Sequence, residues 1–169
     1  MSSIAVRSGG QTGVDRAALD FAQRHGLSYG GWCPRGGWAE DFLVPPGLLA
    51  AYPRLTETPS DSPEQRTAWN VRDSHATLIL VRGDELNRSP GTMFTKQTAD
   101  VVFLRPCLAV DLLQSDSVER ACEWLARIVN APADSESQLH IAGPRESEAP
   151  GIYARERAFI AELIACEYI

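Results

Sequence analysis

Ser8-Gly9-Gly10-Gln11-Thr12-Gly13-Val14-Asp15-Arg16-Ala17 is the stretch of sequence that decides the fold. It joins a short apolar run, residues 4–6, to an amphipathic helical pattern that begins near Val14. Glycine permits positive φ and close approach to main-chain N–H groups, and a helix start offers free donors and the positive end of its dipole. Such a turn typically binds phosphate, although a turn that needs glycine for steric reasons alone has the same composition. We favour the binding interpretation because Thr12, Asp15 and Arg16 add three polar side chains.

Neither of two better-known glycine motifs matches this turn in full. A P-loop requires Gly-Lys-Ser/Thr, whereas the one lysine of the chain is Lys96, so nucleoside-triphosphate hydrolysis of that type is excluded. The dinucleotide fingerprint matches in part, with Ser8, Gly10 and Gly13 at its three glycine positions. Its acidic residue, expected roughly 20 residues later, is replaced by Cys33-Pro34-Arg35. What remains open is an NADP-type site in which Arg35 contacts a 2′-phosphate.

Composition points to one globular domain over residues 1–169, because the chain is long enough for one core and too short for two ordinary domains. Its residues are 44% hydrophobic and 22% charged. No apolar run approaches the ~20 residues of a membrane span, and the N-terminus does not resemble a signal peptide. We therefore expect a cytoplasmic protein without membrane contact. The net charge of -6 argues against nucleic acid as a partner.

The cysteines and histidines do not predict a metal site. The four cysteines and three histidines are scattered, and no Cys-x-x-Cys pair is present. We expect most of the cysteines to be free thiols.

Strand-like and helical patterns alternate along the chain. We expect strands at residues 4–7, 27–32, 54–57, 77–81, 107–112 and 139–142. We expect helices at residues 14–25, 62–73, 92–99, 117–129 and 152–165. Strands separated by helices imply right-handed crossovers, so the predicted fold is α/β, a doubly wound, mostly parallel Rossmann-like sheet in three α/β/α layers.

In that architecture ligands bind beyond the carboxyl ends of the strands. Polar, glycine-rich loops follow four of the strands, at residues 8–13, 33–41, 82–92 and 143–147. Their shared edge favours one cleft over independent turns. The helix after Ser62-Pro63 adds Arg66, whose place near that edge makes it a ligand candidate. Asp73 and Trp69, later in the same helix, are interpreted as a solvated carboxylate and a packing residue.

Several ordered motifs resemble one known family over essentially the whole chain. They are Gly9–Ala17, Cys33-Pro34-Arg35-Gly36 with Ala39-Glu40-Asp41, Arg66-Thr67 with Asn70-Val71, and Ala142-Gly143-Pro144-Arg145-Glu146-Ser147 with Pro150-Gly151-Ile152-Tyr153. The chain is similar to the molybdenum-cofactor carrier family. That family belongs to a superfamily of Rossmann-like nucleotide-binding proteins that includes the Lonely Guy phosphoribohydrolases.

The chain departs from the hydrolase relatives at one position. Their Gly-Thr-x-x-Glu turn carries a glutamate that takes part in cleaving an N-glycosidic bond, and the matching stretch here is Gly91-Thr92-Met93-Phe94-Thr95. Threonine cannot supply a carboxylate, so Thr95 favours binding over hydrolysis. If the protein is an enzyme, its catalytic carboxylate has to come from Glu40, Asp41 or Glu146.

The resemblance implies a carrier or storage protein for molybdenum cofactor (molybdopterin), or for a related nucleotide phosphate. The metal would arrive on the sulfurs of the pterin and need no protein ligand. Alternatives are a nucleotide or ADP-ribose N-glycosidic hydrolase with a displaced carboxylate and a nucleotide-sensing module. We expect a small-molecule phosphate ligand and a homo-oligomer, a dimer or tetramer. The predicted binding residues are Gly9, Gly10, Gln11, Thr12, Gly13, Asp15, Arg16, Arg35, Arg66, Asn70, Gly91, Thr92, Gly143 and Arg145.

Overall fold

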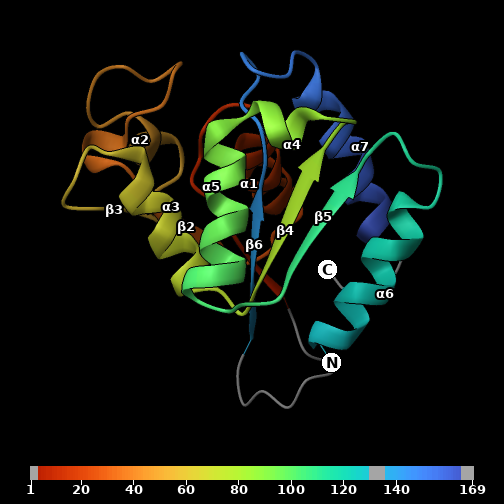
Figure 1. The fold of residues 1–169 in the computed structure, drawn as a ribbon. Coiled ribbons are helices and arrows are strands. Elements are labelled where there is room, and N and C mark those ends of the chain that lie inside the picture. The colour runs from red at the N-terminus through yellow and green to blue at the C-terminus, as the bar shows by residue number, and fades with distance from the viewer. Residues whose placement is uncertain (1–3, 130–135, 165–169) are drawn as a thin grey trace.

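The protein is built on one parallel sheet, seen in a computed structural model that describes residues 4–129 and 136–164 (Figure 1). The six strands lie in the order β3-β2-β1-β6-β4-β5, and neighbouring strands all run parallel. The strands are β1 (Ile4–Arg7), β2 (Tyr29–Cys33), β3 (Leu55–Glu57), β4 (Ala76–Val81), β5 (Cys107–Asp111) and β6 (Ser137–Ala142). Each of the predicted strands is therefore present.

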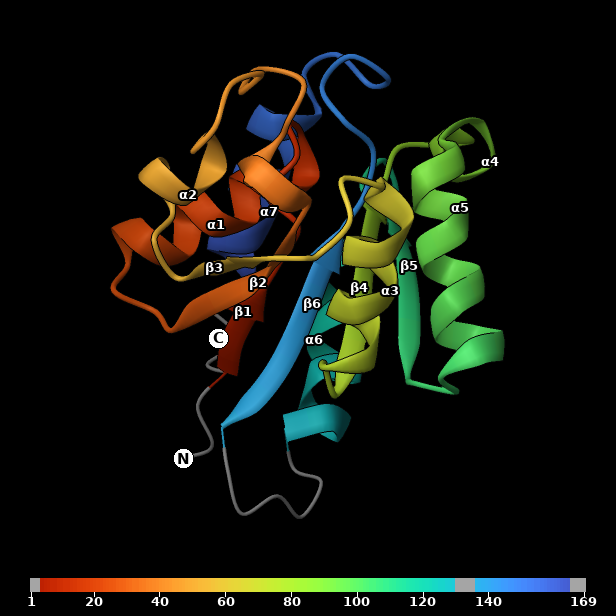
Figure 2. The ribbon, with the colours of Figure 1, turned by 90° about the vertical axis from the view of Figure 1, so that its left-hand side faces the viewer.

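Helices cover both faces of this sheet (Figure 2). The longer ones are α1 (Val14–Arg24), α3 (Pro63–Arg72), α5 (Pro90–Gln97), α6 (Ser117–Val129) and α7 (Ile152–Ile164). On one face α7 packs against both α1 and α6, and on the other α3 packs against α5. The three-layer, doubly wound architecture predicted from the sequence is confirmed.

The main core lies between the sheet and the α1, α6 and α7 layer. All six residues of β4 are buried, as its continuous apolar sequence requires of a strand covered on both faces. Leu78 and Leu80 of this strand belong to the same cluster as Val14 of α1 and Leu125 of α6. A smaller cluster, which includes Leu19, joins α1 to α2 (Leu48–Ala51) and β3. It anchors the loop-rich segment after β2.

Some local details of the structure were not predicted. The short helices α2 and α4 (Glu85–Arg88) were not predicted, and a π-helical turn, Thr98–Val102, extends α5. Ser62 is the cap position of α3 but makes no capping bond, because its hydroxyl donates to Glu64. The side chain of Gln65 instead accepts from the N–H of Ser60 at 2.9 Å. The expected end of the last helix at Ala165 lies outside the described residues.

The cysteines differ from one another. Cys33 and Cys107 are free thiols, whereas Cys122 is disulfide-bonded. Burial raises the pKa of the Cys33 thiol to about 11, which makes it unreactive at neutral pH. Across the described ranges, no helix is both long and apolar enough to span a bilayer.

One acidic side chain is buried without compensation. Glu156 on α7 is fully buried, and both of its carboxyl oxygens are without a hydrogen-bond partner among residues 4–129 and 136–164. Burial, with a smaller contribution from Asp15, raises its pKa well above the usual range. In the folded protein Glu156 therefore keeps its proton even at pH values at which an exposed glutamate has ionised.

Candidate functional site

A cavity of about 360 Å³ opens where the order of the strands reverses. From β1 the chain proceeds outward through β2 and β3, and it then crosses to β4 and β5 before β6 returns to the centre. Such a reversal separates the loops at the carboxyl edge and leaves a crevice for a ligand. The cavity is lined by Gln11, Asp15, Pro63, Glu64, Arg66, Thr67, Ser89, Pro90, Gly91, Thr92, Phe94, Thr95, Ala142, Gly143 and Arg145.

The structure brings half of the predicted binding residues to this cavity. Those that line it are Gln11, Asp15, Arg66, Gly91, Thr92, Gly143 and Arg145. They come from the turn after β1 together with the start of α1, from the loop after β6, and from the first turns of α3 and α5. Residues from four separate segments therefore meet at one edge of the sheet, as the predicted shared cleft requires.

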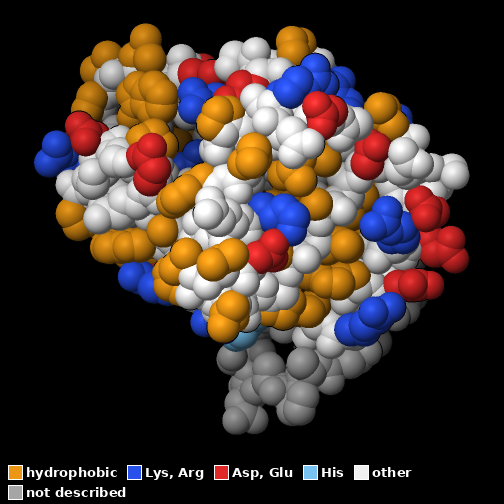
Figure 3. All heavy atoms as spheres, viewed as in Figure 1, with side chains coloured by type: hydrophobic (Ala, Val, Ile, Leu, Met, Phe, Trp, Pro, Cys, Tyr) orange, Lys and Arg blue, Asp and Glu red, His pale blue; other side chains and the backbone are white. Residues whose placement is uncertain are grey.

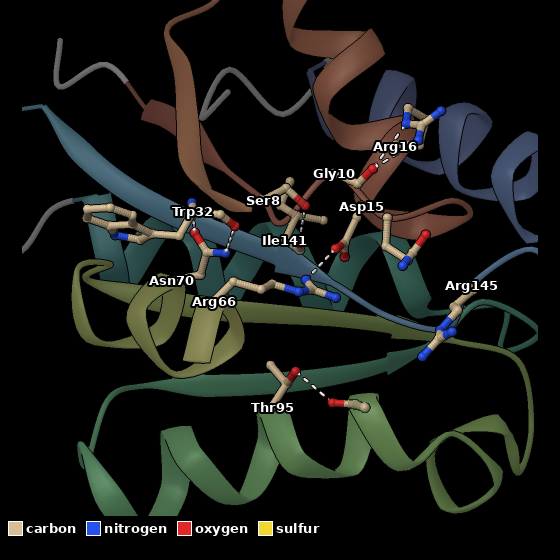
Figure 4. A network of polar contacts seen from close by, with 12 residues as sticks. Ser8, Gly10, Asp15, Arg16, Trp32, Arg66, Asn70, Thr95, Ile141 and Arg145 are labelled. Atoms are coloured by element: carbon tan, nitrogen blue, oxygen red, sulfur yellow. Dashed lines mark hydrogen bonds and ion pairs between the residues drawn. The ribbon is translucent and has the colours of Figure 1, made fainter. Parts of the chain in front are cut away.

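A buried ion pair forms one wall of the cavity (Figure 4). Arg66 Nη1 lies 2.8 Å from Asp15 Oδ2, and the two side chains are only 15% and 4% exposed. Burial raises the pKa of Asp15, although Arg66 and the N–H of Gln11 favour its ionised form. A Cβ built on Gly9 would come within 1.8 Å of Arg66 Nη1. The guanidinium thus lies directly against the backbone of the glycine-rich turn.

The start of α5 forms the opposite wall. Ser89 caps this helix by accepting a hydrogen bond from the N–H of Thr92. A Cβ on Gly91 would meet no atom within 4 Å, so the backbone there is open to a ligand. The hydroxyl of Thr95 donates to the carbonyl of Gly91 at 2.9 Å. The Thr95 hydroxyl is therefore hydrogen-bonded within its own helix, and a threonine cannot act as a general base.

Arg145 brings a second positive charge to the cavity from the loop after β6. Its side chain is about one-third exposed, and its closest acidic group, Glu148, lies 3.8 Å away. Glu148 also accepts a 2.7 Å hydrogen bond from Ser89 Oγ, which ties the loop to the start of α5. In Figure 4 the Arg145 guanidinium points from its loop toward α5. Arg145 is thus free to contact an anion in the cavity.

The glycines of the turn after β1 pack against the protein itself. Gly10 has a φ of +76°, and a Cβ there would lie 3.0 Å from Leu48 and 3.2 Å from Leu55. Gly13 has a φ of +75°, and a Cβ there would lie 2.3 Å from the carbonyl oxygen of Pro144. The close approach that requires glycine at these two positions is made by side chains of α2 and β3 at Gly10 and by the loop after β6 at Gly13. Anion binding by the backbone of this turn stays a prediction.

Arg16 and the three candidate carboxylates lie outside the cavity. Arg16 pairs with Asp41 at 2.7 Å and donates to the carbonyl of Gly10, and its guanidinium lowers the pKa of Asp41. Glu146 accepts from the N–H of Gly151 at 2.5 Å. Asp41 and Glu146 line a separate depression beside Thr12, Gly13 and Arg16.

Glu40 has a structural role between two loops. Its carboxylate accepts hydrogen bonds from the hydroxyls of Thr12 and Ser147. Burial disfavours its ionised form, but these bonds outweigh burial and lower its pKa. None of Glu40, Asp41 and Glu146 lines the cavity, whose carboxylates are those of Asp15 and Glu64.

Asn70 and Arg35 also lie away from the cavity lining. Asn70 is fully buried, and its amide accepts from the N–H of Trp32 and donates to the carbonyl of Trp32, both at 2.8 Å. Asp73, expected to be merely solvated, accepts a 2.7 Å hydrogen bond from Trp32 Nε1. Trp69 packs edge-on against Trp32, with ring centroids 4.8 Å apart, which confirms its packing role. Arg35 lines a neighbouring groove.

Some lining residues were missed by the sequence analysis. Thr67 follows Arg66 directly, and Phe94 lies one helical turn after Gly91. The helix start at Ser89-Pro90 is the signal that could have placed Phe94, because Pro favours the first helical position. The predicted helix began two residues too late, at Thr92.

No metal centre is evident, since the described part of the chain contains no group of three or more histidine, cysteine, aspartate or glutamate side chains placed to hold an ion.

Comparison with known proteins agrees with the geometry. A solved structure named "Putative molybdenum carrier protein", from Syntrophus aciditrophicus SB, is 36% identical, covers 96% of each chain and superposes with a TM-score of 0.81. No curated protein matches the sequence. The model of the circularly permutated YpsA SLOG family matches residues 6–164. Counting β6 as the first strand changes the strand order to 4-3-2-1-5-6, a doubly wound order in which the crevice follows the first strand. The chain therefore belongs to the circularly permutated YpsA SLOG family.

Proposed function

We propose that this protein binds a phosphate-bearing heterocycle in the cavity and carries or stores it without cleaving it. The observation that supports this most directly is the arrangement of Arg66, Arg145 and the open backbone at Gly91 around one cavity at the switch point of the sheet. Arginine holds phosphate oxygens through pairs of parallel hydrogen bonds, and a helix start adds N–H donors. Both groups of donors converge on the same space.

Molybdenum cofactor is the first candidate ligand. The similar protein from Syntrophus aciditrophicus SB is named as a molybdenum carrier. The cavity offers donors for the cofactor's phosphate at Arg66 and Arg145, and Phe94 and Pro63 offer apolar contacts for a planar ring. The metal would stay on the pterin sulfurs, as the family resemblance implies. A related nucleotide phosphate would use the same contacts.

Hydrolysis is the weaker alternative. Cleavage of an N-glycosidic bond develops positive charge on the ribose, and a positioned acid or base contributes ~100- to 10,000-fold to such a step. Thr95 stands where the hydrolases have a glutamate, and the three carboxylates proposed as substitutes line other surfaces. Of the two carboxylates that do line the cavity, Asp15 is bound to Arg66, and Glu64 accepts a hydrogen bond from the hydroxyl of Ser62.

The test uses protein purified from a strain that makes molybdenum cofactor. Mass spectrometry and metal analysis should find a pterin phosphate and molybdenum with the wild-type protein, and less of both with Arg145→Ala. Protein that contains neither, and that binds no nucleoside monophosphate in calorimetry, would contradict the proposal. The homo-oligomeric state and the cytoplasmic location stay predictions.

A further inference from the structure

A groove that the proposed function does not use borders the cavity. A groove of about 360 Å³ is lined by Arg35, Gly36, Trp38, Leu43, Pro45, Asp61 and Pro63. Pro63 at the start of α3 lines both this groove and the cavity. Each volume alone is near the small end of the ~300–1,000 Å³ that ligand sites span. A ligand that crosses Pro63 can therefore occupy both.

The groove is apolar and exposed. Leu43 and the adjacent Val44 are 68% and 74% exposed, among the highest values for large hydrophobic side chains in the described residues. In Figure 3 hydrophobic side chains gather at the upper left, over the loop that precedes α2. Exposed apolar surface bordered by polar residues marks a binding site more often than chance. Trp38 adds an indole, whose flat face suits stacking on a heterocycle.

The walls of the groove are fixed by backbone contacts. The N–H of Gly36 donates to Glu57 at 2.6 Å, and that of Arg35 donates to the carbonyl of Ser60 at 3.0 Å. Ala39 and Phe42 exchange backbone hydrogen bonds of 3.1 and 3.0 Å. The backbone around the groove is thus ordered without a ligand, which lowers the entropy cost of binding one.

The rim of the groove holds one cation, Arg35, that can contact an anionic linker. Arg35 lies 3.8 Å from Asp61, and the two side chains are 63% and 79% exposed, so this pair is weak. Arg35 is available to a phosphate that passes from the cavity into the groove. The groove itself presents no further cation among its lining residues.

We propose that the groove receives a second planar heterocycle, joined through phosphates to the half of the ligand that the cavity holds, so that the protein prefers dinucleotides to mononucleotides. This inference rests on the proposed function. It assigns Trp38 and Leu43 to ring contact and Arg35 to the bridging phosphates.

Titration calorimetry of the full chain tests the preference. The probes are AMP, ADP and diadenosine diphosphate, together with the corresponding guanosine series, so that ADP and GDP control for the second phosphate. We expect the dinucleotide to bind about tenfold or more tightly than the nucleoside diphosphate, because it buries apolar surface at the groove. It should also quench tryptophan fluorescence, and Trp38→Phe should remove most of that change.

A matched pair of variants locates the contact. Leu43→Ser should weaken dinucleotide binding about tenfold and leave nucleoside monophosphate binding unchanged. Leu113→Ser, at a leucine of similar exposure (63%) on the β5–α6 connection, should change neither.

Three outcomes would contradict the inference. Equal affinity for dinucleotide and diphosphate would overturn it and leave the proposed function intact. Loss of monophosphate binding in Leu43→Ser would show that the groove is not a binding surface separate from the cavity. Failure of the wild-type protein to bind any nucleotide or pterin phosphate would overturn the proposed function itself.

Discussion

The buried carboxyl of Glu156 makes a quantitative prediction about stability. In the folded protein it holds its proton, because ionisation would leave a charge in the core without a partner. In the unfolded chain it ionises with a pKa of about 4.3. Above that pH the folded state binds one more proton than the unfolded state, so the free energy of unfolding falls as pH rises.

The slope follows from the number of protons alone. It is about 1.4 kcal/mol for each pH unit, from pH ~4.3 up to the raised pKa in the folded protein. Glu156→Gln keeps the shape of the protonated carboxyl and removes the titration. The variant should match the wild type near pH 4.5 and exceed it increasingly at higher pH. For a chain of this length, roughly 3–5 °C in Tm separates the two proteins per pH unit.

Urea unfolding followed by tryptophan fluorescence at half-unit steps from pH 4.5 to 8 measures this difference. Burial lowers the pKa of His140 to about 3, and this group destabilises the fold as pH falls below ~6.5, but it is present in both proteins and cancels. Glu119→Gln, on the exposed face of α6, controls for the loss of one acidic side chain. Parallel curves for wild type and Glu156→Gln over the whole range would refute the reasoning, and would mean that the carboxyl is paired or hydrated.

Three further predictions concern the site. Arg145→Ala should weaken the binding of a nucleotide or pterin phosphate roughly ten- to a hundredfold in calorimetry, because one charge-assisted contact is worth about 1.5–3 kcal/mol. The Tm should change little, and a large fall in Tm with unchanged affinity would assign Arg145 a structural role. Arg66→Ala should lower the free energy of unfolding, measured with urea, by about 3–5 kcal/mol because it leaves Asp15 buried and unpaired. Adding Asp15→Asn should restore part of that loss, and an unaffected Arg66→Ala variant would show that the pair is hydrated. The wild-type protein should release no free base from AMP or ADP-ribose over long incubation, as followed by chromatography, and turnover on the order of 1 per second would contradict the interpretation of Thr95.

The fold was predictable because its signals are local and repeated. The apolar run of β4 and the periodic apolar face of α1 each specify an element, and alternation along the chain specifies a parallel sheet. The position of Arg66 near the carboxyl edge followed from its place in the first turn of a helix. What could not be predicted was which distant segments would pack against the glycines after β1.

Gly10 illustrates the limit. A glycine in the sequence is consistent with a positive φ at this position. The atoms that approach Gly10, however, belong to Leu48 and Leu55, far along the chain. The same holds for Glu40, whose partners Thr12 and Ser147 lie in loops at opposite ends of the sequence. Sequence spacing does not encode such contacts, so a residue that looks like a ligand contact can turn out to join two loops.

The double hydrogen bond between Asn70 and the backbone of Trp32 has a consequence for the kinetics of ligand capture. The pairing of β1 with β2 extends to Arg7 and Gly30, and beyond it the side chain of Asn70 hydrogen-bonds both the N–H and the carbonyl of Trp32. Because Asn70 and Arg66 lie one helical turn apart, this bond prevents α3 from sliding along the sheet. Arg66 is then already in position when an anion arrives. Capture should proceed as a single encounter whose rate scales linearly with ligand concentration, with no slow rearrangement at saturation in stopped-flow records.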